Sequence, residues 1–309
     1  MEACPVCESG RFRKLPTPGR WIGTEVFDPL RGKLGLVDCR DCGLAFVNPR
    51  PASQQLASFY NGNTYDCHET AGSASSGQVA EFLMSRIEPQ LPADAPRTLL
   101  DYGAGGGGFL LDMRARGWDV RGFEPGLRGR AACEAAGLDV TGDAGTLPSA
   151  AFGLVTMHHV FEHLEDPGDA LSIVRRVLAP DGRLFIEVPN LRSLRARLAL
   201  PALSRRLQVD ERFRAFPIHL AYYSVDTLTR LLARHGWIVQ TSFTVGMGLD
   251  EYLVAPPRAA PAAQATATDT SRRRAASPDG WSRRLRRRVR DAYLGMGIGE
   301  NLAVIARPA

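Results

Sequence analysis

Residues 97–111 read RTLLDYGAGGGGFLL, and this stretch decides the fold. A short apolar run reaches Asp101, a series of glycines follows, and helix-compatible residues begin at Phe109. The pattern predicts a strand, a tight turn and a helix, because glycine permits positive φ and lets a ligand approach the bare backbone. The unpaired N–H groups at the start of such a helix favour a nucleotide-like ligand.

The spacing of the glycines fits two classes of cofactor. Gly103, Gly105 and Gly108 match the dinucleotide fingerprint, whereas Gly103, Gly105 and Gly107 match the methyltransferase version. Asp101 favours the second class, because a carboxylate just before the turn would repel a pyrophosphate and would attract a cofactor that carries an ammonium and a sulfonium. The stretch resembles motif I of the class I S-adenosylmethionine (SAM) methyltransferases.

The length and the charge distribution limit the number of domains and the kinds of surface that this chain can have. A chain of 309 residues can hold one α/β domain and a small module. The net charge is +5, but residues 258–290 contain ten arginines and two aspartates, so the remainder is net acidic and no basic surface is expected over the main domain. We find no apolar run of membrane-spanning length and no signal-peptide pattern, so we expect a cytoplasmic protein without a membrane span.

Four of the six cysteines form two C-x-x-C pairs, Cys4 with Cys7 and Cys39 with Cys42, with 31 residues between the pairs. Two such pairs in a chain expected in the cytoplasm predict a structural zinc site with four thiolates. A redox C-x-x-C would account for one pair but not for both. The module has few apolar residues, so we expect it to need the metal to fold, with short hairpins in residues 21–37.

Strand and helix patterns alternate after the glycine turn. Strands are expected at 119–123, 138–141, 152–157, 183–188, 237–245 and 301–306, and helices at 78–91, 109–116, 127–136, 167–178 and 227–235. Such alternation predicts a parallel sheet that binds ligands at the carboxyl ends of its strands. The resemblance implies an α/β fold with a Rossmann-like seven-stranded methyltransferase sheet, whose last strand is antiparallel, preceded by a small zinc-ribbon module.

The chain divides into five parts by composition and pattern. We expect a zinc-binding module at 1–50, a helical connector at 51–96, the methyltransferase core at 97–254 with a rim insertion at 191–221, a disordered linker with a basic amphipathic helix at 255–290, and the final strand at 291–309.

Acidic residues end the second and third core strands. Glu124 is placed to accept the ribose hydroxyls of a nucleoside, and Asp143 to accept an adenine amino group, as the corresponding residues do in the resembling family. A helix cap or a solvated turn is the alternative for both. With Asp101 and the glycines 103, 105 and 107, they form the predicted cofactor site, to which we add His158 at the end of the fourth strand.

The residues His159-x-x-Glu162-His163 match a zinc-protease pattern. That pattern requires a continuous helix, whereas these residues follow a buried strand and precede Pro167, so the context instead resembles the motif after the fourth strand of this methyltransferase group. In that family an aspartate usually follows the phenylalanine of the fourth strand, where this chain has Gly153. The difference weakens the prediction of where the strand begins.

Residues 216–224, FPIHLAYYS, resemble the segment before the fifth helix in sugar-modifying relatives, in which a histidine preceded by glutamate faces the substrate. His219 matches that histidine, and Ile218 replaces the glutamate. A neutral imidazole can act as a base near neutral pH. The alternative is that His219 only bonds the backbone and holds the rim. The candidate catalytic residues are His219, His159 and Tyr222.

The two cysteine pairs and the segment after them resemble the N-terminal zinc region of bacterial SAM methyltransferases that modify small molecules, often nucleotide-activated sugars. The resemblance implies SAM as cofactor, structural Zn²⁺ and a small-molecule acceptor. One alternative is an RNA base methyltransferase, in which residues 272–290 contact RNA or another anionic surface. Another is a SAM-binding pseudo-enzyme. The sequence leaves the methylated atom and the oligomeric state open.

Overall fold

The computed structural model describes residues 1–309 except 18–20, 22, 63–75, 194–214, 246–291 and 293. The segments predicted as a basic amphipathic helix and as most of the rim insertion lie outside the described residues. Within the described part, no helix has the length and apolar character needed to cross a membrane.

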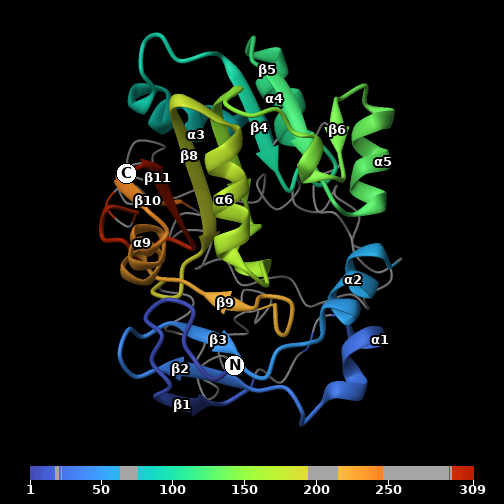
Figure 1. Ribbon diagram of the computed structural model, residues 1–309, viewed down its shortest axis with the longest axis vertical. Helices are drawn as coiled ribbons and strands as arrows, with labels where there is room; N and C mark the ends of the chain where they lie inside the picture. Colours follow the sequence, from blue (N-terminus) through green and yellow to red (C-terminus); the bar gives the residue numbers. More distant parts are fainter. Residues whose placement is uncertain (18–20, 22, 63–75, 194–214, 246–291, 293) are drawn as a thin grey trace, which may run out of the picture.

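The core is a seven-stranded sheet with the order β10-β11-β8-β7-β4-β5-β6 (Figure 1). Its strands are β4 (Thr98–Tyr102), β5 (Asp119–Phe123), β6 (Val140–Thr141), β7 (Phe152–His158), β8 (Leu178–Pro189), β10 (Trp237–Val245) and β11 (Asn301–Pro308). β4 pairs in parallel with β5 and β7, whereas β11 is antiparallel to β8 and β10. The predicted sheet and its antiparallel last strand are therefore confirmed.

Helices cover both faces of this sheet. Two neighbouring residues of β4 belong to different hydrophobic clusters. Leu99 belongs to the cluster that contains residues of α3 (Ser76–Ile87), α4 (Gly108–Ala115) and α5 (Leu127–Ala135), whereas Leu100 belongs to the cluster that contains residues of α6 (Pro167–Val177) and α9 (Val225–Arg234). Both leucines are fully buried. Successive side chains of a strand point to opposite faces, so in a strand covered on both sides two neighbouring residues such as Leu99 and Leu100 are both apolar.

A second sheet, ordered β1-β2-β3-β9, lies at the opposite end of the molecule from β6 and α3 (Figure 1). It contains β1 (Phe12–Leu15), β2 (Leu36–Cys39) and β3 (Ala45–Val47) from the N-terminal module, and β9 (Ala221–Tyr222) from the region after the core strand β8. Tyr222 pairs with Ala45 in antiparallel register. The N-terminal module therefore shares a sheet with the segment that carries His219.

The prediction of short hairpins in residues 21–37 is wrong. The chain forms a short helix α1 (Thr24–Phe27) and a 3-10 helix η1 (Asp28–Leu30) before β2. Pro29 stands in the first turn of η1, where a missing N–H costs nothing because that donor has no partner within a helix. A proline can mark a break between strands, but here Pro29 starts a helical turn.

The N-terminal module and α2 (Ser53–Asn61) lie against the carboxyl ends of the core strands. Ser53 Oγ donates to Glu165 Oε2 at 2.6 Å, and the Tyr60 hydroxyl lies 2.9 Å from His163 Nδ1. The backbone N–H of Val47 donates to the carbonyl of Leu220 at 3.0 Å. These contacts place one wall of the region where an α/β sheet binds its ligands.

Candidate functional site

The glycine turn between β4 and α4 is held in a left-handed conformation. Gly103, Gly105 and Gly107 have φ values of 89°, 52° and 80°. A Cβ on Gly103 would lie 2.4 Å from Val160, and one on Gly107 would lie 2.4 Å from Leu138, whereas one on Gly105 would meet nothing within 4 Å. Packing thus requires glycine at the two outer positions, and open space borders the middle one, where a ligand can reach the backbone.

Glu124, at the end of β5, is bonded to this turn. Its Oε2 accepts the N–H of Gly105 at 2.8 Å, and its Oε1 accepts the N–H of Gly126 at 2.7 Å. Burial raises the pKa of this carboxyl, and the two amides and Arg130 oppose that rise. The predicted ribose-binding acid therefore lies beside the open glycine.

Asp101 is buried at 3% exposure within β4, and its Oδ1 accepts the hydroxyl of Thr156 from β7 at 2.8 Å. Asp143 caps the 3-10 helix η3 (Ala144–Thr146), where its Oδ1 accepts the N–H of Gly145 at 2.8 Å. Asp143 therefore forms the helix cap that was the alternative to a cofactor-binding role. Neither bond uses every lone pair of these carboxylates.

His158 ends β7 and contacts aromatic rings on one face of the sheet. Its ring centroid lies 4.4 Å from that of Phe109 and 5.2 Å from that of Phe185. Its Nδ1 lies 3.2 Å from Oε2 of Glu187, which also accepts the side-chain amide of Asn301 through Oε1. The imidazole is thus oriented by a buried carboxylate that the sequence analysis did not single out.

Three histidines surround the buried carboxylate of Glu162, which follows β7 in the 3-10 helix η4 (Phe161–His163). Glu162 is 1% exposed, and its Oε1 lies 3.4 Å from Nδ1 of His159 and 3.9 Å from Nε2 of His219. The rings of His163 and His219 meet edge to face with centroids 4.7 Å apart. We call these four residues, His159, Glu162, His163 and His219, the imidazole–carboxylate cluster.

Burial and neighbouring charges shift the pKa values of the residues in this cluster. Burial acts to raise the pKa of Glu162, but the neighbouring imidazoles outweigh it and lower that pKa to about 2. Burial lowers the pKa of His219 to about 3, and His163 shifts in the same direction. At neutral pH Glu162 is therefore ionised, whereas His163 and His219 are neutral.

The structure brings the three candidate catalytic residues together. His219 and Tyr222 lie on the segment that joins the N-terminal sheet, with ring centroids 6.0 Å apart, and His159 lies across Glu162 from His219. Sequence reasoning missed Glu162 and His163 as site residues. The pattern His159-x-x-Glu162-His163 was the available signal, but η4 is only three residues long, so the continuous helix of a zinc protease is absent here.

The four paired cysteines converge on one point, where they could hold a metal ion. Their Sγ atoms lie within 4.8 Å of one another, with 3.6 Å between Cys4 and Cys42 and 3.5 Å between Cys7 and Cys39. Two thiolates on a tetrahedral zinc ion with bonds of about 2.3 Å would be roughly 3.8 Å apart. The donor set and its spacing therefore fit zinc.

The thiols of this group differ in acidity. Burial raises the pKa of Cys4 to about 11 and raises that of Cys42 further. At Cys39 burial also acts upward, but the backbone amides of Cys42 and Asp41 outweigh it and lower the pKa to about 7. A bound cation must therefore displace protons from at least two of the four thiols at neutral pH.

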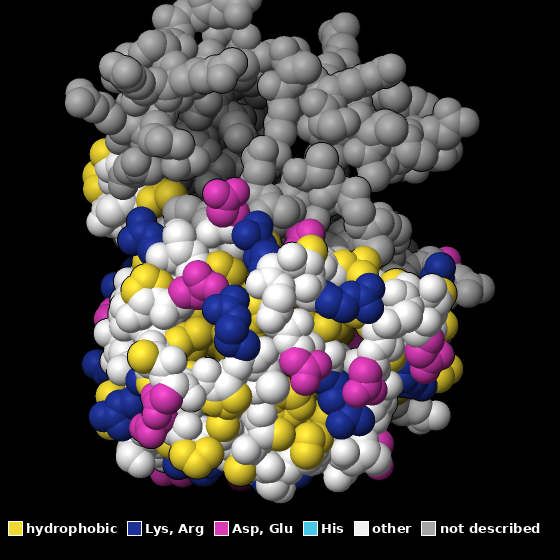
Figure 2. Space-filling model, turned by 90° about the horizontal axis from the view of Figure 1, so that it is seen from above, with side chains coloured by type: hydrophobic (Ala, Val, Ile, Leu, Met, Phe, Trp, Pro, Cys, Tyr) yellow, Lys and Arg dark blue, Asp and Glu magenta, His cyan; other side chains and the backbone are white. Residues whose placement is uncertain are grey.

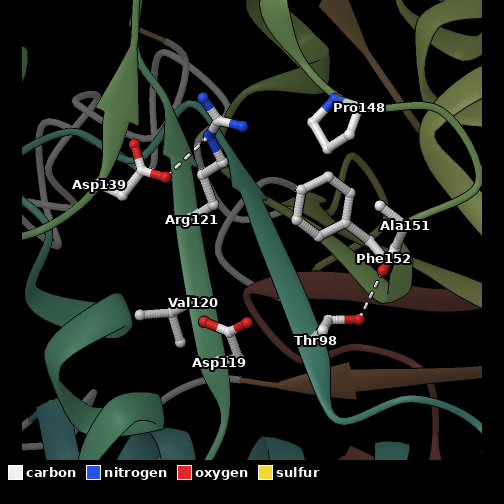
Figure 3. Close-up of a pocket in the computed structure, with 8 residues that line it drawn as sticks. All are labelled: Thr98, Asp119, Val120, Arg121, Asp139, Pro148, Ala151 and Phe152. Atoms are coloured by element: carbon white, nitrogen blue, oxygen red, sulfur yellow. Dashed lines mark hydrogen bonds and ion pairs between the residues drawn. The ribbon is translucent and has the colours of Figure 1, made fainter.

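A surface hollow lies at the other edge of the core sheet, where Thr98, Asp119 and Phe152 begin β4, β5 and β7 (Figure 3). An ion pair of 3.1 Å between Arg121 and Asp139 borders it. Ligands of open α/β sheets bind at the carboxyl ends of the strands, so this hollow is not the cofactor site. Figure 2 looks onto this end of the molecule, and over the residues of this face that the structure describes it shows basic and acidic side chains interspersed.

Comparison with known protein families finds one match to this chain. A family model described as a methyltransferase domain matches residues 76–242, more than half of the chain. The C-methyltransferase NovU of Streptomyces niveus is 27% identical over 254 residues, which cover 76% of this chain and 56% of NovU. The chain therefore spans little more than half the length of this curated relative.

Two solved structures show more distant similarity. A SAM-dependent methyltransferase from Archaeoglobus fulgidus has 18% identity and a TM-score of 0.47, with 74% of this chain and 93% of that chain covered. The [4+2]-cyclase SpnF has 17% identity and a TM-score of 0.48, with 84% and 98% covered.

Proposed function

Because the chain belongs to the methyltransferase domain family, we propose that it transfers the methyl group of SAM to a small molecule. The observation that carries this proposal is the glycine turn, which is open to a ligand at Gly105 and has Glu124 beside it. When SAM is bound, its sulfonium supplies an electrophilic methyl carbon. The protein must then hold the acceptor in line with that carbon and remove a proton from it.

We assign the cofactor to the carboxyl ends of β4, β5 and β7. The open backbone at Gly105 would face the cofactor, Glu124 would accept its ribose hydroxyls, and Asp143 would accept its adenine amino group. Gly103 and Gly107 hold the turn in shape. Asp101 would place negative charge near the amino acid part of the cofactor, and His158 would border the same site.

We propose a carbon atom of a small molecule as the acceptor, with a nucleotide-activated sugar or a secondary-metabolite intermediate as its class. The name of NovU, a C-methyltransferase, supports a carbon acceptor. A carbon acceptor must lose a proton, and a histidine of the cluster would take it. His219 is the first candidate, His159 is the second, and Tyr222 lies near enough to orient the acceptor.

We further propose that Cys4, Cys7, Cys39 and Cys42 bind one zinc ion with a structural role. Four thiolates close the coordination sphere and leave no position for water or substrate. Because β3 and β9 share a sheet, the ion would also stabilise the segment that carries His219.

Calorimetry with SAM and with NAD tests the cofactor, and incubation with SAM and nucleotide-activated sugars, read by mass spectrometry, tests the transfer. We expect SAM to bind with micromolar affinity and NAD not to bind. Tighter binding of NAD would refute the proposal. Binding of SAM without transfer to any acceptor of this class would favour the pseudo-enzyme, whereas transfer to RNA would favour the RNA methyltransferase.

A further inference from the structure

The imidazole–carboxylate cluster holds a buried negative charge without a permanent counter-charge. Among the residues that the structure describes, the ion-pair partners of Glu162 within 4.0 Å are His159 and His219, and no lysine or arginine is among them. Neither carboxylate oxygen has a hydrogen bond of normal geometry in the described part of the chain. A buried carboxylate requires a cation or strong donors, because the loss of hydration is otherwise uncompensated.

The nitrogen atoms around this carboxylate are oriented as metal ligands. Nδ1 of His163 lies 3.0 Å from the carbonyl oxygen of Ile218 and 2.9 Å from the hydroxyl of Tyr60. A proton on Nδ1 suits both neighbours, because the carbonyl can only accept and the hydroxyl oxygen can accept as well, and this tautomer leaves a lone pair on Nε2. A histidine that ligates a metal commonly donates its other N–H to a backbone carbonyl in this way. Nδ1 of His219 is buried, and Nε2 is the nitrogen nearer to Glu162.

The backbone holds the two segments of the cluster together. The N–H of Leu220 donates to the carbonyl of Glu162 at 2.8 Å. One ligand atom from each of Glu162, His163 and His219 lies within 4.8 Å of the others. Two ligands with bonds of about 2.1 Å to a tetrahedral ion would be roughly 3.4 Å apart. The 3.9 Å between Glu162 and His219 is about half an ångström longer, a difference that rotation of the glutamate side chain can close.

We propose that Glu162, His163 and His219 bind a divalent transition-metal ion such as Zn²⁺, at a second site separate from the four cysteines. Two imidazoles and one carboxylate suit ions of this class, and three protein ligands leave positions open for a substrate. His159 lies beside the carboxylate, with Nδ1 3.4 Å from Oε1, where it orients the ligand. Metal binding at this site does not depend on the proposed function.

The role of the ion does rest on the proposed function. The cluster lies after β7, at the same edge of the sheet as the glycine turn, so the ion would face the acceptor. Its open positions would hold oxygen atoms of the acceptor and lower the pKa of a bound hydroxyl or of a C–H group next to a bound carbonyl. Because Nε2 of His219 cannot both ligate the ion and accept a proton, His159 would then be the base.

Metal content tests the site. The purified full-length protein is saturated with Zn²⁺, passed through gel filtration and analysed by plasma mass spectrometry. We expect two zinc ions per chain in the wild type and one in Glu162→Gln and in His219→Gln. His235→Gln, a histidine at the end of α9 outside the cluster, is the matched control and should retain two.

One zinc ion per wild-type chain, with Mn²⁺ and Co²⁺ also unbound at saturation, would overturn the proposal, as would two ions in both cluster variants. Circular dichroism identifies a variant that has not folded, and the other variant then decides. Calorimetry with SAM on the same samples separates this result from the proposed function. A protein with two zinc ions that does not bind SAM would retain the metal site and refute the methyltransferase.

Discussion

At the scale of single residues, Glu124 has two tasks that compete for one carboxylate. It holds the glycine turn through the amides of Gly105 and Gly126, and we propose that it also accepts the ribose hydroxyls of the cofactor. Each oxygen has lone pairs beyond those bonds, so both tasks are compatible. The side chain thus links the shape of the turn to the affinity of the site.

We predict that Glu124→Ala weakens SAM binding by about 1.5–3 kcal/mol, the range for a hydrogen bond to a charged group. Calorimetry measures the loss, and thermal melting reports whether the turn has been disturbed. Glu134→Ala, an exposed glutamate of α5, is the control and should bind SAM normally. Unchanged affinity in Glu124→Ala would show that this carboxylate only supports the turn.

At the scale of an element, the glycine turn separates residues required by packing from a residue that faces a ligand. We predict that Gly107→Ala destabilises the fold by roughly 2–4 kcal/mol, because a left-handed alanine is strained and its methyl group would overlap Leu138 and Cys133. Gly105 also has a positive φ, but open space surrounds the position of an added methyl group. Gly105→Ala should therefore lower the free energy of unfolding by only about 1–2 kcal/mol.

Urea unfolding and SAM calorimetry distinguish the two variants, because Gly107→Ala mainly loses stability and Gly105→Ala mainly loses SAM affinity. Gly105→Ala should fold and lose SAM affinity, because the new methyl group occupies the space that we assign to the cofactor. If Gly105→Ala binds SAM as tightly as the wild type, the cofactor does not approach the backbone there.

Packing at the start of β7 explains why this chain has Gly153 where the resembling family usually has aspartate. A Cβ at this position would lie 2.0 Å from the carbonyl oxygen of Pro96, an atom of the backbone that cannot move alone. We predict that Gly153→Ala lowers the free energy of unfolding by roughly 1–3 kcal/mol or more, as overpacking does. SAM affinity of the folded fraction should not change, since the strand start lies at the edge remote from the glycine turn. Equal stability in urea unfolding would contradict this account.

At the scale of the whole molecule, the N-terminal module supports the segment that carries the candidate base. β3 pairs with β9, and Val47 bonds to Leu220 next to His219. We predict that Cys39→Ser loses the zinc of the four-cysteine site, lowers the melting temperature and reduces methyl transfer more than SAM affinity. Metal analysis, thermal melting and calorimetry measure the three effects.

Cys67→Ser, outside the two C-x-x-C pairs, is the control and should match the wild type in zinc content. Loss of transfer in a Cys39→Ser protein whose module remains folded would contradict a structural role for the zinc. Loss of SAM binding as strong as the loss of transfer would contradict the idea that the module acts through the His219 segment.

Much of the fold could be predicted from local patterns. The strand before Gly103, the alternation that follows it and the last strand all follow from apolar periodicity and from glycine, which act over a few neighbouring residues. The cysteine pairs likewise predicted their own convergence, because C-x-x-C spacing brings two thiols to one point. The hairpins expected in residues 21–37 failed because proline fits a helical turn as well as a break.

The sequence by itself determined the alternation of strands and helices, the glycine turn and the two C-x-x-C pairs, since each arises from residues close together or from a repeated pattern, and the resemblance to a methyltransferase family implied the seven-stranded sheet. Only the tertiary structure decided that β9 joins the N-terminal sheet, that Pro96 excludes a side chain at position 153, and that His219 meets Glu162. These contacts join segments far apart in the chain, and their distances depend on how whole elements pack. No local pattern encodes that packing, so the imidazole–carboxylate cluster emerged only in three dimensions.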